Sequence, residues 1–402
     1  MSQRRALVIG GSMSGLLAAV MLKRRGWEVD VFERVSGELA GRGAGIVAQP
    51  ELIARLGNLG LDTRDLGVAI TRRQMLDREG RVTAKSACPQ VLTAWERAYR
   101  VLRDAFAADR YHRGRSLEAF DQNGFGVVAH FGDGHTAAGD VLIGADGLRS
   151  TVRQQCLPAA VPLYAGYVAW RALIPESALP DAIHSELFGA MTFCMPPGEQ
   201  FLGYPVAGPD NDLRPGRLRY NIVWYRPADE TKELSWLLTD DRGASHAISI
   251  PPPLIRRDAI AGMREAAEQL LAPQFRAIVR LIEEPLLQPI YDLATPRLAF
   301  GRAVVIGDAA FVARPHVAAG VSKAADDAAA LALALDAGDV EDALRRFEGE
   351  RLPENNRIIE RARHLGAYLQ ATQSAEERTR SARHGIPEAV LAETAVLDFL
   401  YA

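Results

Sequence analysis

Three carboxylates in this sequence stand where apolar runs end, and carboxylates so placed could contact a charged or polar ligand. Asp308 ends the run 304–307, and a helix pattern begins shortly after it, in the alanine-rich stretch that Lys323 opens. Glu33 and Asp146 stand at the ends of two earlier runs, 28–33 and 140–145. A strand that ends on a carboxylate, with a helix N-terminus aimed at the same place, indicates that a polar or charged group lies there.

The stretch Gly10-Gly11-Ser12-Met13-Ser14-Gly15 has the composition of a phosphate-binding turn. It lies between a buried-strand pattern and a helix pattern, and Glu33 ends the next strand. Glycines allow the tight turn, amides at the helix N-terminus face a pyrophosphate, and a carboxylate about 20 residues on accepts from ribose hydroxyls. Ser12 replaces the middle glycine of the usual motif. We interpret the stretch as a dinucleotide site rather than a simple strand–helix turn, but the motif alone does not separate NAD from FAD.

The second carboxylate belongs to the stretch Gly144-Ala145-Asp146-Gly147. A single aspartate after a strand is most often a helix cap or a turn residue. Here serine and arginine occupy the next helix turns, as Arg149, Ser150 and Arg153. The same arrangement, a strand followed by an aspartate, recurs at Asp308.

These residues need a scaffold of strands and helices, and the apolar pattern supplies one. Residues 6–9, 16–22 and 28–33 predict a strand–helix–strand unit. Residues 95–108 predict a helix, and residues 125–131 predict the first strand of a hairpin that turns at Asp133-Gly134. From about 164 to 288, aromatic residues, prolines and alternating strands predict an antiparallel sheet inserted in the first domain. Buried strands resume after Leu298, and the charged end from Glu350 predicts helices.

The totals limit the classes of function. The 402 residues suffice for two domains, and 48% apolar with 24% charged residues is ordinary for a globular protein. A net charge of −3 argues against nucleic acid and anionic membrane surfaces as partners. The three cysteines are scattered, so we expect no disulfide framework and a cytoplasmic location. The N-terminus has no signal-peptide pattern, and the apolar run after Gly15 is too short to span a bilayer.

The three motifs together resemble the flavin-dependent aromatic hydroxylases of the para-hydroxybenzoate hydroxylase fold. That family carries an N-terminal dinucleotide fingerprint, an Asp-Gly motif and a late Gly-Asp motif, and all three occur here in order. In detail the chain is similar to the 2,6-dihydroxypyridine 3-hydroxylase-like monooxygenases. The similar stretches are 10–15, 164–171, 220–226 and Arg314-Pro315-His316 with Gly320 and Lys323.

The resemblance implies an α/β fold and FAD as the cofactor. The fold would have a Rossmann-like FAD-binding domain, an inserted antiparallel β-sheet substrate domain and a C-terminal helical region. The implied division of the chain is 1–75, 96–163 and 291–348 for the FAD-binding domain, 76–95 and 164–290 for the substrate domain, and 349–402 for the helical region. The implied FAD contacts are Gly10, Ser12, Ser14, Gly15, Glu33, Arg34, Arg42, Tyr99, Asp146, Asp308, Pro315, Ala319 and Gly320.

Within that set, the resemblance gives each group a role. Ser12 and Ser14 would meet the pyrophosphate, Glu33 the adenosine ribose, and Asp308 the ribityl and pyrophosphate region. The helix after Gly320 would point at the N1 and O2 edge of the flavin, where reduced flavin carries negative charge. The chain departs from the family pattern in having Phe311 where many members have histidine and Lys323 where many have asparagine. Tyr99 stands where many members have an arginine that meets FAD, with Arg100 and Arg103 adjacent.

The implied reaction is monooxygenation of an electron-rich ring, a pyridinol or a phenol, with NADPH or NADH and O2, by way of a flavin C4a-hydroperoxide. The protein would exclude water and place the ring, and a base near a ring hydroxyl would help. His316 is the candidate base or substrate-orienting group, with a backbone-bonding histidine as the alternative. Tyr204, Trp224 and Tyr225 either line the substrate pocket or form sheet core.

Other observations leave alternatives open. Arg171 and Arg226 could pair with an acidic substrate, but surface ion pairs are the more ordinary interpretation. The other seven of the eight histidines show no ligand spacing, so we expect no metal. A flavoprotein of the same fold that epoxidises or reduces a non-aromatic substrate is the alternative function, and a nicotinamide-binding protein without flavin is a third. The expected partner is a small aromatic substrate, with a possible homodimer through the C-terminal helices.

Overall fold

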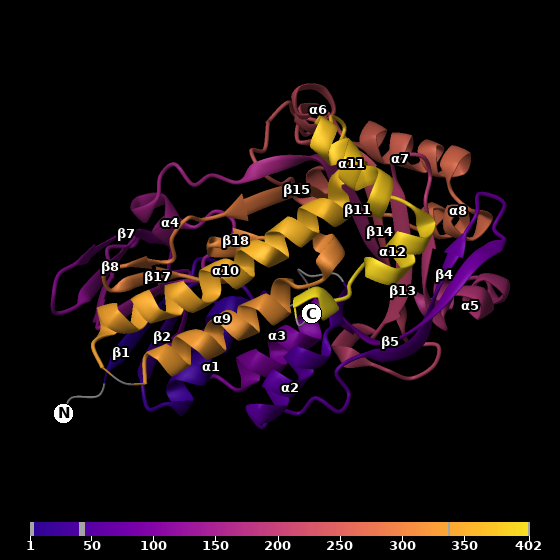
Figure 1. Cartoon of the computed structure of the whole chain (residues 1–402). Coiled ribbons are helices and arrows are strands. Elements are labelled where there is room, and N and C mark those ends of the chain that lie inside the picture. The colour runs from indigo at the N-terminus through magenta and orange to yellow at the C-terminus, as the bar shows by residue number, and fades with distance from the viewer. Residues whose placement is uncertain (1–3, 40–44, 337, 401–402) are drawn as a thin grey trace.

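Two β-sheets lie side by side in the computed structural model, one mainly parallel and one mainly antiparallel, and long helices from the C-terminal half run across them (Figure 1). The structure describes residues 4–39, 45–336 and 338–400. This is the expected α/β class, with an antiparallel sheet inserted between parts of a Rossmann-like unit and helices at the C-terminal end.

The first sheet has six strands in the order β16-β17-β10-β1-β2-β6, and only the edge strand β16 runs antiparallel to its neighbour. Its strands read as continuous apolar runs because helices and a small sheet cover both faces. They are β1 (Arg5–Ile9), β2 (Glu28–Glu33), β6 (Tyr111–Arg113), β10 (Val141–Gly144), β16 (Ala299–Phe300) and β17 (Ala303–Val305). The strand–helix–strand unit predicted at the start is therefore confirmed as β1, α1 and β2.

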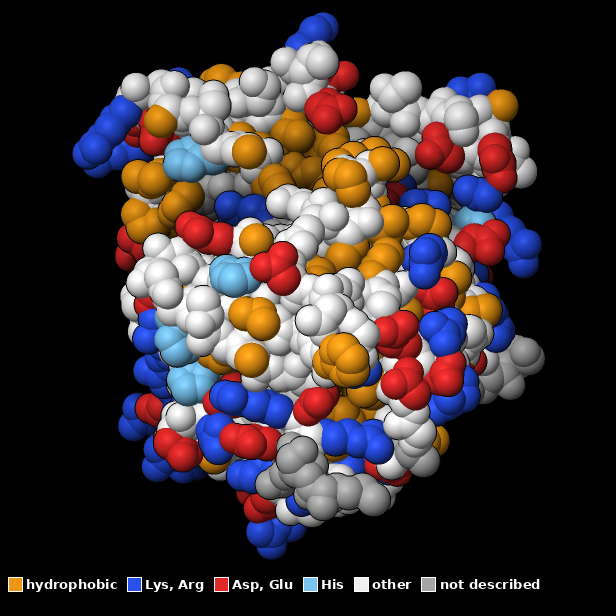
Figure 2. Space-filling view, turned by 90° about the vertical axis from the view of Figure 1, so that its left-hand side faces the viewer, with side chains coloured by type: hydrophobic (Ala, Val, Ile, Leu, Met, Phe, Trp, Pro, Cys, Tyr) orange, Lys and Arg blue, Asp and Glu red, His pale blue; other side chains and the backbone are white. Residues whose placement is uncertain are grey.

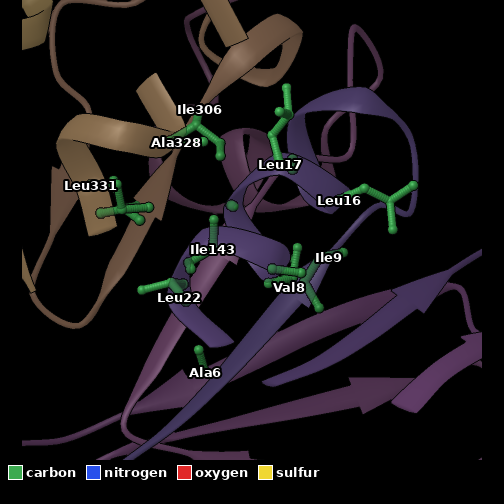
Figure 3. Close-up of a cluster of buried hydrophobic side chains, with 14 of the residues drawn as sticks. Ala6, Val8, Ile9, Leu16, Leu17, Leu22, Ile143, Ile306, Ala328 and Leu331 are labelled. Carbon is green, nitrogen blue, oxygen red and sulfur yellow. The ribbon is translucent and has the colours of Figure 1, made fainter. Parts of the chain in front are cut away.

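Helices α1 (Met13–Arg24) and α9 (Gly320–Ala334) pack against each other and against the first sheet. Figure 3 shows the core between them, where Val8, Leu17, Ile143 and Leu331 come from four different elements. The opposite face carries a three-stranded sheet of β7 (Leu117–Gln122), β8 (Val127–Phe131) and β9 (Thr136–Gly139). Strands β8 and β9 form the predicted hairpin.

The second sheet has nine strands in the order β18-β15-β11-β14-β13-β12-β4-β5-β3, and only the β12–β4 pair is parallel. Its strands are β3 (Gly45–Ala48), β4 (Val68–Leu76), β5 (Val82–Ala94), β11 (Leu163–Pro175), β12 (Ala190–Cys194), β13 (Gln200–Val206), β14 (Arg219–Pro227), β15 (Leu286–Ala294) and β18 (Phe311–Val312). Strands β3 and β4 differ from the expected division, which put residues up to 75 in the FAD-binding domain. They join this sheet because β5 pairs with both of them.

The two faces of the second sheet bury different side chains. Trp170 and Trp224 point to one face, where α7 (Arg257–Leu270) and α8 (Pro273–Arg280) cover them. Tyr167 and Tyr225 point to the other face, which looks toward the first sheet and the C-terminal helices. This alternation follows from the two-residue period of a strand.

The C-terminal end is helical, as predicted. Helix α10 (Val340–Gly366) runs along α9, and α11 (Ala375–His384) and α12 (Pro387–Glu393) turn back over the second sheet (Figure 1). A buried network joins α9, α10 and the turn before Asp308: Asp327 accepts hydrogen bonds from Arg351, Asn355 and the Gly307 amide. The remaining helices are α2 (Pro50–Asn58), α3 (Trp95–Asp104), α4 (Thr151–Cys156), α5 (Asp181–Leu187) and α6 (Ser235–Leu237).

The surface in Figure 2 mixes acidic and basic side chains over its lower part, and hydrophobic side chains gather mainly in its upper part. This view agrees with the nearly balanced charge of the sequence, 47 basic against 50 acidic residues. Among the helices that the structure describes, none is both long enough and apolar enough to cross a membrane.

Candidate active site

The three carboxylates singled out from the sequence lie at one edge of the six-stranded sheet. Strands β17, β10, β1 and β2 are neighbours in this order and run parallel, so their carboxyl ends lie together. Glu33 closes β2, Asp146 follows β10 and Asp308 follows β17. In open α/β sheets this edge is where ligands bind.

A cavity of about 300 Å³ opens beside Glu33 at this edge, and we call it the Glu33 cavity. Gly10, Ser12, Arg34 and Asp146 also line it. The turn after β1 that borders this cavity needs glycine at position 10. Gly10 has a φ of 103°, and a Cβ on it would lie 2.3 Å from the Ala145 oxygen.

Gly15 serves packing and does not line either cavity of the site. A Cβ on Gly15 would lie 1.8 Å from the carbonyl oxygen of Gly10, so the first turn of α1 can approach the β1 turn only without a side chain there. The close approach places the N-terminus of α1 at the sheet edge. This is the role that the third glycine of a dinucleotide motif has in general.

The carboxylate of Glu33 is held by backbone amides. Its Oε2 accepts from the Gly11 N–H at 2.8 Å and its Oε1 from the Val35 N–H at 2.9 Å. An ionised carboxylate has about four acceptor sites, so these two bonds fix its orientation and leave sites for hydroxyl groups of a ligand.

A second cavity, of about 370 Å³, extends from the sheet edge to the second sheet, and we call it the His316 cavity. Ser14, Asp308, Pro315, Ala319 and Gly320 line it. It shares four lining residues with the Glu33 cavity, namely Ser12, Trp95, Ala145 and Gly147. The two cavities therefore adjoin and form one elongated site.

Two helix N-termini open into this site. Helix α1 begins after Ser12 and α9 begins after Ala319, and neither has a side-chain cap or an acidic residue in its first turn. The first amides of a helix lack intrahelical partners, and the helix dipole adds positive potential there. Both ends therefore favour negative charge, one at the shared part of the cavities and one within the His316 cavity.

Asp308 presents its carboxylate to the His316 cavity and has no side-chain hydrogen-bond partner among the residues that the structure describes. Burial raises the pKa of this carboxyl, and the nearby Lys323 partly opposes the rise. The Lys323 side chain is completely buried, with its Nζ 3.9 Å from Asp327 Oδ2 and no hydrogen-bond partner in the described part of the chain. Lys323 does not line the cavity itself, but its proximity lowers the pKa of Asp308 and so favours the ionised carboxylate there.

Asp146 is both a helix cap and a group that faces the Glu33 cavity. Its Oδ2 accepts from the amides of Thr151 at 2.7 Å and Val152 at 3.3 Å, at the start of α4. Its Oδ1 is buried and lacks a partner within the described residues. Burial also raises the pKa of this carboxyl. One oxygen therefore caps a helix, and the other is free for a ligand in the Glu33 cavity.

His316 lies in the wall of the His316 cavity and is 2% exposed. Its Nε2 is 2.8 Å from the Tyr167 hydroxyl, and its ring lies 4.5 Å from that of Tyr225, centroid to centroid. Burial, followed by the nearby Arg314, lowers the pKa of His316 to about 3. Arg314 is itself paired with Asp292 at 2.8 Å. The imidazole is therefore neutral at neutral pH.

Arg171, Tyr204 and Tyr225 line the cavity on the side of the second sheet. Arg171 donates to Gln288 Oε1 at 2.9 Å and to the Gly45 oxygen at 3.3 Å, and its Nε is buried without a partner among described residues. No described carboxylate pairs with it. Burial raises the pKa of Tyr204 to about 12, although Arg171 opposes the rise, so its hydroxyl is a donor at neutral pH.

Two predicted site residues lie elsewhere. Trp224 points away from the cavity and donates from Nε1 to Glu199 at 2.8 Å, because neighbouring strand residues face opposite sides and Tyr225 takes the cavity side. The prediction that Trp224 lines the pocket is therefore wrong. Tyr99 stacks beneath Trp95, with ring centroids 5.1 Å apart, and is 1% exposed, so Trp95 and not Tyr99 faces the cavities. Arg42 lies outside the described residues.

The sequence reasoning missed several lining residues. Trp95 is the first residue of the predicted helix 95–108, and a large aromatic side chain at a helix start near the glycine turn is a signal for it. Tyr167 does not line the cavity but bonds to His316 from behind it, and it lies in the stretch 164–171 that carried the resemblance. Thr394 and Ala395 also line the His316 cavity, and no local pattern indicates them.

The chemical groups of FAD fit the donors and acceptors of this site, and they occur along the cofactor in the same order as their partners along the two cavities. The buried orphan oxygen of Asp146 and the two uncapped helix N-termini provide an acceptor and two anion sites. Glu33 can accept from ribose hydroxyls at one end, and the α9 N-terminus can meet an anionic flavin edge at the other.

Comparison with known proteins agrees with this chemistry. A family model described as FAD binding domain-like matches residues 164–292. The chain is 32% identical to 2,6-dihydroxypyridine 3-monooxygenase of Paenarthrobacter nicotinovorans over 96% of both chains. It is 29% identical to 3-amino-4-hydroxybenzoate 2-monooxygenase of Streptomyces cremeus, over 94% of this chain and 91% of that one. The solved structure of 2,6-dihydroxypyridine-3-hydroxylase from Arthrobacter nicotinovorans superposes with a TM-score of 0.87 at 31% identity, over 93% and 94% of the two chains.

The similarity to these enzymes over almost the whole chain shows an FAD-dependent monooxygenase, and the helix N-termini and strand-end carboxylates of the site fit that cofactor. The chain belongs to the flavin-dependent aromatic hydroxylases of the para-hydroxybenzoate hydroxylase fold. The predicted family, fold and FAD cofactor are confirmed, and the alternatives of an epoxidase, a reductase or a flavin-free protein gain no support from these relatives.

Proposed function

We propose that this enzyme hydroxylates a small electron-rich ring that carries an ionisable oxygen, a pyridinol or a phenol, and that the His316 cavity holds the ring. One observation carries the proposal: Arg171, whose guanidinium has no carboxylate partner among the described residues, lines the same cavity as two tyrosine side chains and the α9 N-terminus. Among the described lining residues, Asp308 is the one carboxylate, and it belongs to the cofactor end. Two relatives named for dihydroxypyridine and aminohydroxybenzoate support a ring of this kind.

We propose that FAD is held by the residues that line the two cavities at the sheet edge. These are Gly10, Ser12, Ser14, Glu33, Arg34, Asp146, Asp308, Pro315, Ala319 and Gly320, with Gly15 allowing the close approach of α1 and Trp95 in place of Tyr99. When bound, FAD would take two electrons from NADH or NADPH and use them to activate O2, chemistry that the described side chains of the cavity could not provide. The contribution of the protein is to bind the ring, orient it and exclude water.

Arg171 would bind the ring oxygen and favour its ionised form. A cation within hydrogen-bond distance lowers the pKa of an acidic hydroxyl, and the ionised ring is the better nucleophile. The Tyr204 and Tyr225 hydroxyls have no hydrogen-bond partner in the described part of the chain, and they would donate to the same oxygen or to a second one. Ring ionisation would then need no strongly basic side chain.

His316 would orient the ring rather than act as a strong base. A histidine with a pKa of about 3 holds a proton too weakly to accept one from a hydroxyl at neutral pH. Its Nε2 is engaged with Tyr167, which leaves Nδ1 as the nitrogen available to a ligand. We therefore favour the orienting role of the two roles that the sequence suggested.

Several further expectations belong to this proposal. The choice between NADPH and NADH, the cytoplasmic location, the homodimer and the division of the chain into FAD-binding and substrate segments all stay predictions. In support of the division, every strand of the six-stranded sheet falls in segments assigned to the FAD-binding domain. Arg42 stays a predicted FAD contact.

A substrate panel tests the proposed function. FAD-loaded enzyme would be mixed with hydroxypyridines and hydroxybenzoates, and oxidation of NADH and of NADPH followed together with product mass. We expect one ring to accelerate oxidation and to gain one oxygen atom. Accelerated oxidation that yields hydrogen peroxide with every ring would overturn the substrate class, and no acceleration by any ring would overturn the hydroxylase proposal for this site.

A further inference from the structure

Residues 387–395, which comprise α12 (Pro387–Glu393), Thr394 and Ala395, form a strap across the His316 cavity. Thr394 and Ala395 are 7% and 4% exposed, and both line the cavity. In Figure 1 this yellow part of the chain returns from α11 over the second sheet toward the middle of the molecule. The strap is therefore part of the cavity wall although it is far in sequence from the other lining residues.

Two side chains of the second sheet and one at the start of α2 hold the strap at two carbonyl groups. Gln90 of β5 donates from Nε2 to the Ala395 oxygen at 3.0 Å, and Gln49 donates to the same oxygen at 3.2 Å. Arg73 of β4, completely buried, donates to the Leu391 oxygen at 2.8 Å and to Gln90 Oε1 at 2.8 Å. Arg73 and Gln90 thus clamp the end of α12 and the turn that follows it.

The strap also holds the loop that carries His316. The Ala395 amide donates to the His316 carbonyl oxygen at 2.7 Å. Ala395 has a φ of 55°, a left-handed conformation that is unfavourable for alanine and persists only where the surroundings enforce it. Here hydrogen bonds to both its N–H and its carbonyl oxygen enforce it.

Apolar contacts complete the wall. Val390, Leu391 and Ala395 belong to the same buried cluster as Tyr167 and Tyr225, which flank His316. A displaced strap would therefore open the cavity to water and release the His316 backbone at the same time. The clamp residues Arg73 and Gln90 do not line the cavity themselves.

We propose that the strap is a positioning element of the ring site. It holds His316 in place and excludes water, and so it sets the fraction of NADH or NADPH oxidation that yields hydroxylated ring. This inference rests on the proposed function, because it takes the His316 cavity as the ring site. Gln90 is the positioning residue that can be altered without touching the cavity. Water that enters beside an activated oxygen would divert the two electrons of the reduced nicotinamide to hydrogen peroxide, with the two protons that this reduction of O2 requires.

The variant Gln90→Glu tests the proposal, because a carboxylate keeps a partner for Arg73 but cannot donate to the Ala395 oxygen. The matched control is Gln269→Glu, on an exposed position of α7. In FAD-loaded enzyme we expect Gln90→Glu to speed deuterium exchange of the Ala395 amide by about fivefold or more, as for one lost hydrogen bond. We also expect iodide to quench the bound flavin more strongly, and the control to match the natural protein in both. These two measurements need no ring substrate.

With a ring that the natural enzyme hydroxylates, the share of NADH recovered as hydrogen peroxide should rise several-fold in Gln90→Glu. FAD content and the thermal midpoint should stay near those of the natural protein, and the KM for the ring should rise more than kcat falls. The proposal would be overturned if exchange at Ala395 became faster while the iodide quenching, the share of hydrogen peroxide and the KM for the ring all stayed unchanged. Unchanged exchange would overturn the clamp. If no ring is hydroxylated by the natural enzyme, the proposed function fails, and exchange and quenching still decide whether the strap closes the cavity.

Discussion

Replacing Arg171 by methionine should selectively impair turnover of rings that bind as oxyanions. Methionine keeps most of the side-chain volume and removes the guanidinium. In the structure Arg171 has two neutral acceptors, Gln288 and the Gly45 oxygen, and an unpartnered Nε. A ring oxyanion would therefore be its one ionic partner among the described groups.

The size of the effect follows from the kind of bond that is lost. A hydrogen bond to a charged group contributes about 1.5–3 kcal/mol, and about 1.4 kcal/mol corresponds to a tenfold change. We expect kcat/KM to fall about 10- to 150-fold for an ionisable ring, mostly through KM. The free energy of unfolding should fall by less than about 1 kcal/mol, because Gln288 and the Gly45 oxygen lie at the cavity, where water can replace the lost donor.

The assay compares steady-state NADH or NADPH oxidation and product mass for the natural enzyme and Arg171→Met. Two rings of similar shape are needed, one with an ionisable oxygen and one in which a methoxy group replaces it. Arg226→Met is the matched control, because Arg226 pairs with Glu199 outside the cavity. It should leave kcat/KM for both rings close to that of the natural enzyme.

Two results would refute the reasoning. An equal loss for the ionisable and the methoxy ring would mean that Arg171 acts through shape or through the fold. No loss for the ionisable ring would mean that the oxyanion binds elsewhere. A partial recovery in Arg171→Lys would support a charge effect, since lysine restores the cation without the planar donor pair.

Three other predictions concern the scaffold. Gly15→Ala should yield protein with little bound FAD, because the added Cβ would lie 1.8 Å from a backbone oxygen. The FAD content is measured as the flavin absorbance of the purified enzyme. The control Gly57→Ala, at a position with open space around it, should retain FAD. The pKa of His316 is lowered to about 3, so the unfolded chain binds a proton between about pH 6.5 and 3 that the folded chain does not, and the free energy of unfolding falls as pH drops through this range. At pH 5 the proton bound by the unfolded chain lowers the free energy of unfolding by about 2 kcal/mol. Denaturation at pH 5 and pH 8 should therefore show a smaller loss of stability at pH 5 for His316→Gln than for the natural protein. An equal loss in both proteins would contradict the assignment. Arg351→Met should lower the free energy of unfolding by about 3 kcal/mol, because buried Asp327 loses its ion pair at 2.9 Å while Lys323, 3.9 Å away, forms no hydrogen bond with it. The double variant with Asp327→Asn, which removes the charge and keeps an acceptor, should recover part of the loss, and no recovery would show that the pair is not the cause.

Much of the fold was predictable because its signals are local. The unit of β1, α1 and β2 combines apolar runs of two different periods with a glycine turn, and each signal lies within a few residues of the element it defines. The placement of Glu33, Asp146 and Asp308 followed from the same logic, since each ends a run of buried strand residues. The family resemblance then supplied the order of strands that brings the three carboxylates to one edge.

The details that sequence reasoning missed depend on contacts between distant segments. A two-residue period says that Trp224 and Tyr225 face opposite ways, but which one faces the cavity depends on how α7 and α8 pack on the sheet. The assignment of Tyr99 rather than Trp95 depended on the rotation of one helix. The buried lysine at position 323 was visible as a departure from the family, but its ionic neighbour Asp327 is held by side chains of α10. The hydrogen bond from Ala395 to His316 has no local signal at either end.

The distribution of the lining residues along the chain has a consequence for the order of events during synthesis. All described residues that line the Glu33 cavity lie at or before Thr151, whereas those of the His316 cavity extend to Ala395. A chain emerging from the ribosome can therefore assemble the part of the site that meets the adenosine end long before it can close the part that meets the ring. Until Ala395 has emerged and reached the His316 carbonyl, any flavin already bound faces an open cavity. Completion of the His316 cavity, where we propose that the ring binds, is thus among the last steps in making this chain.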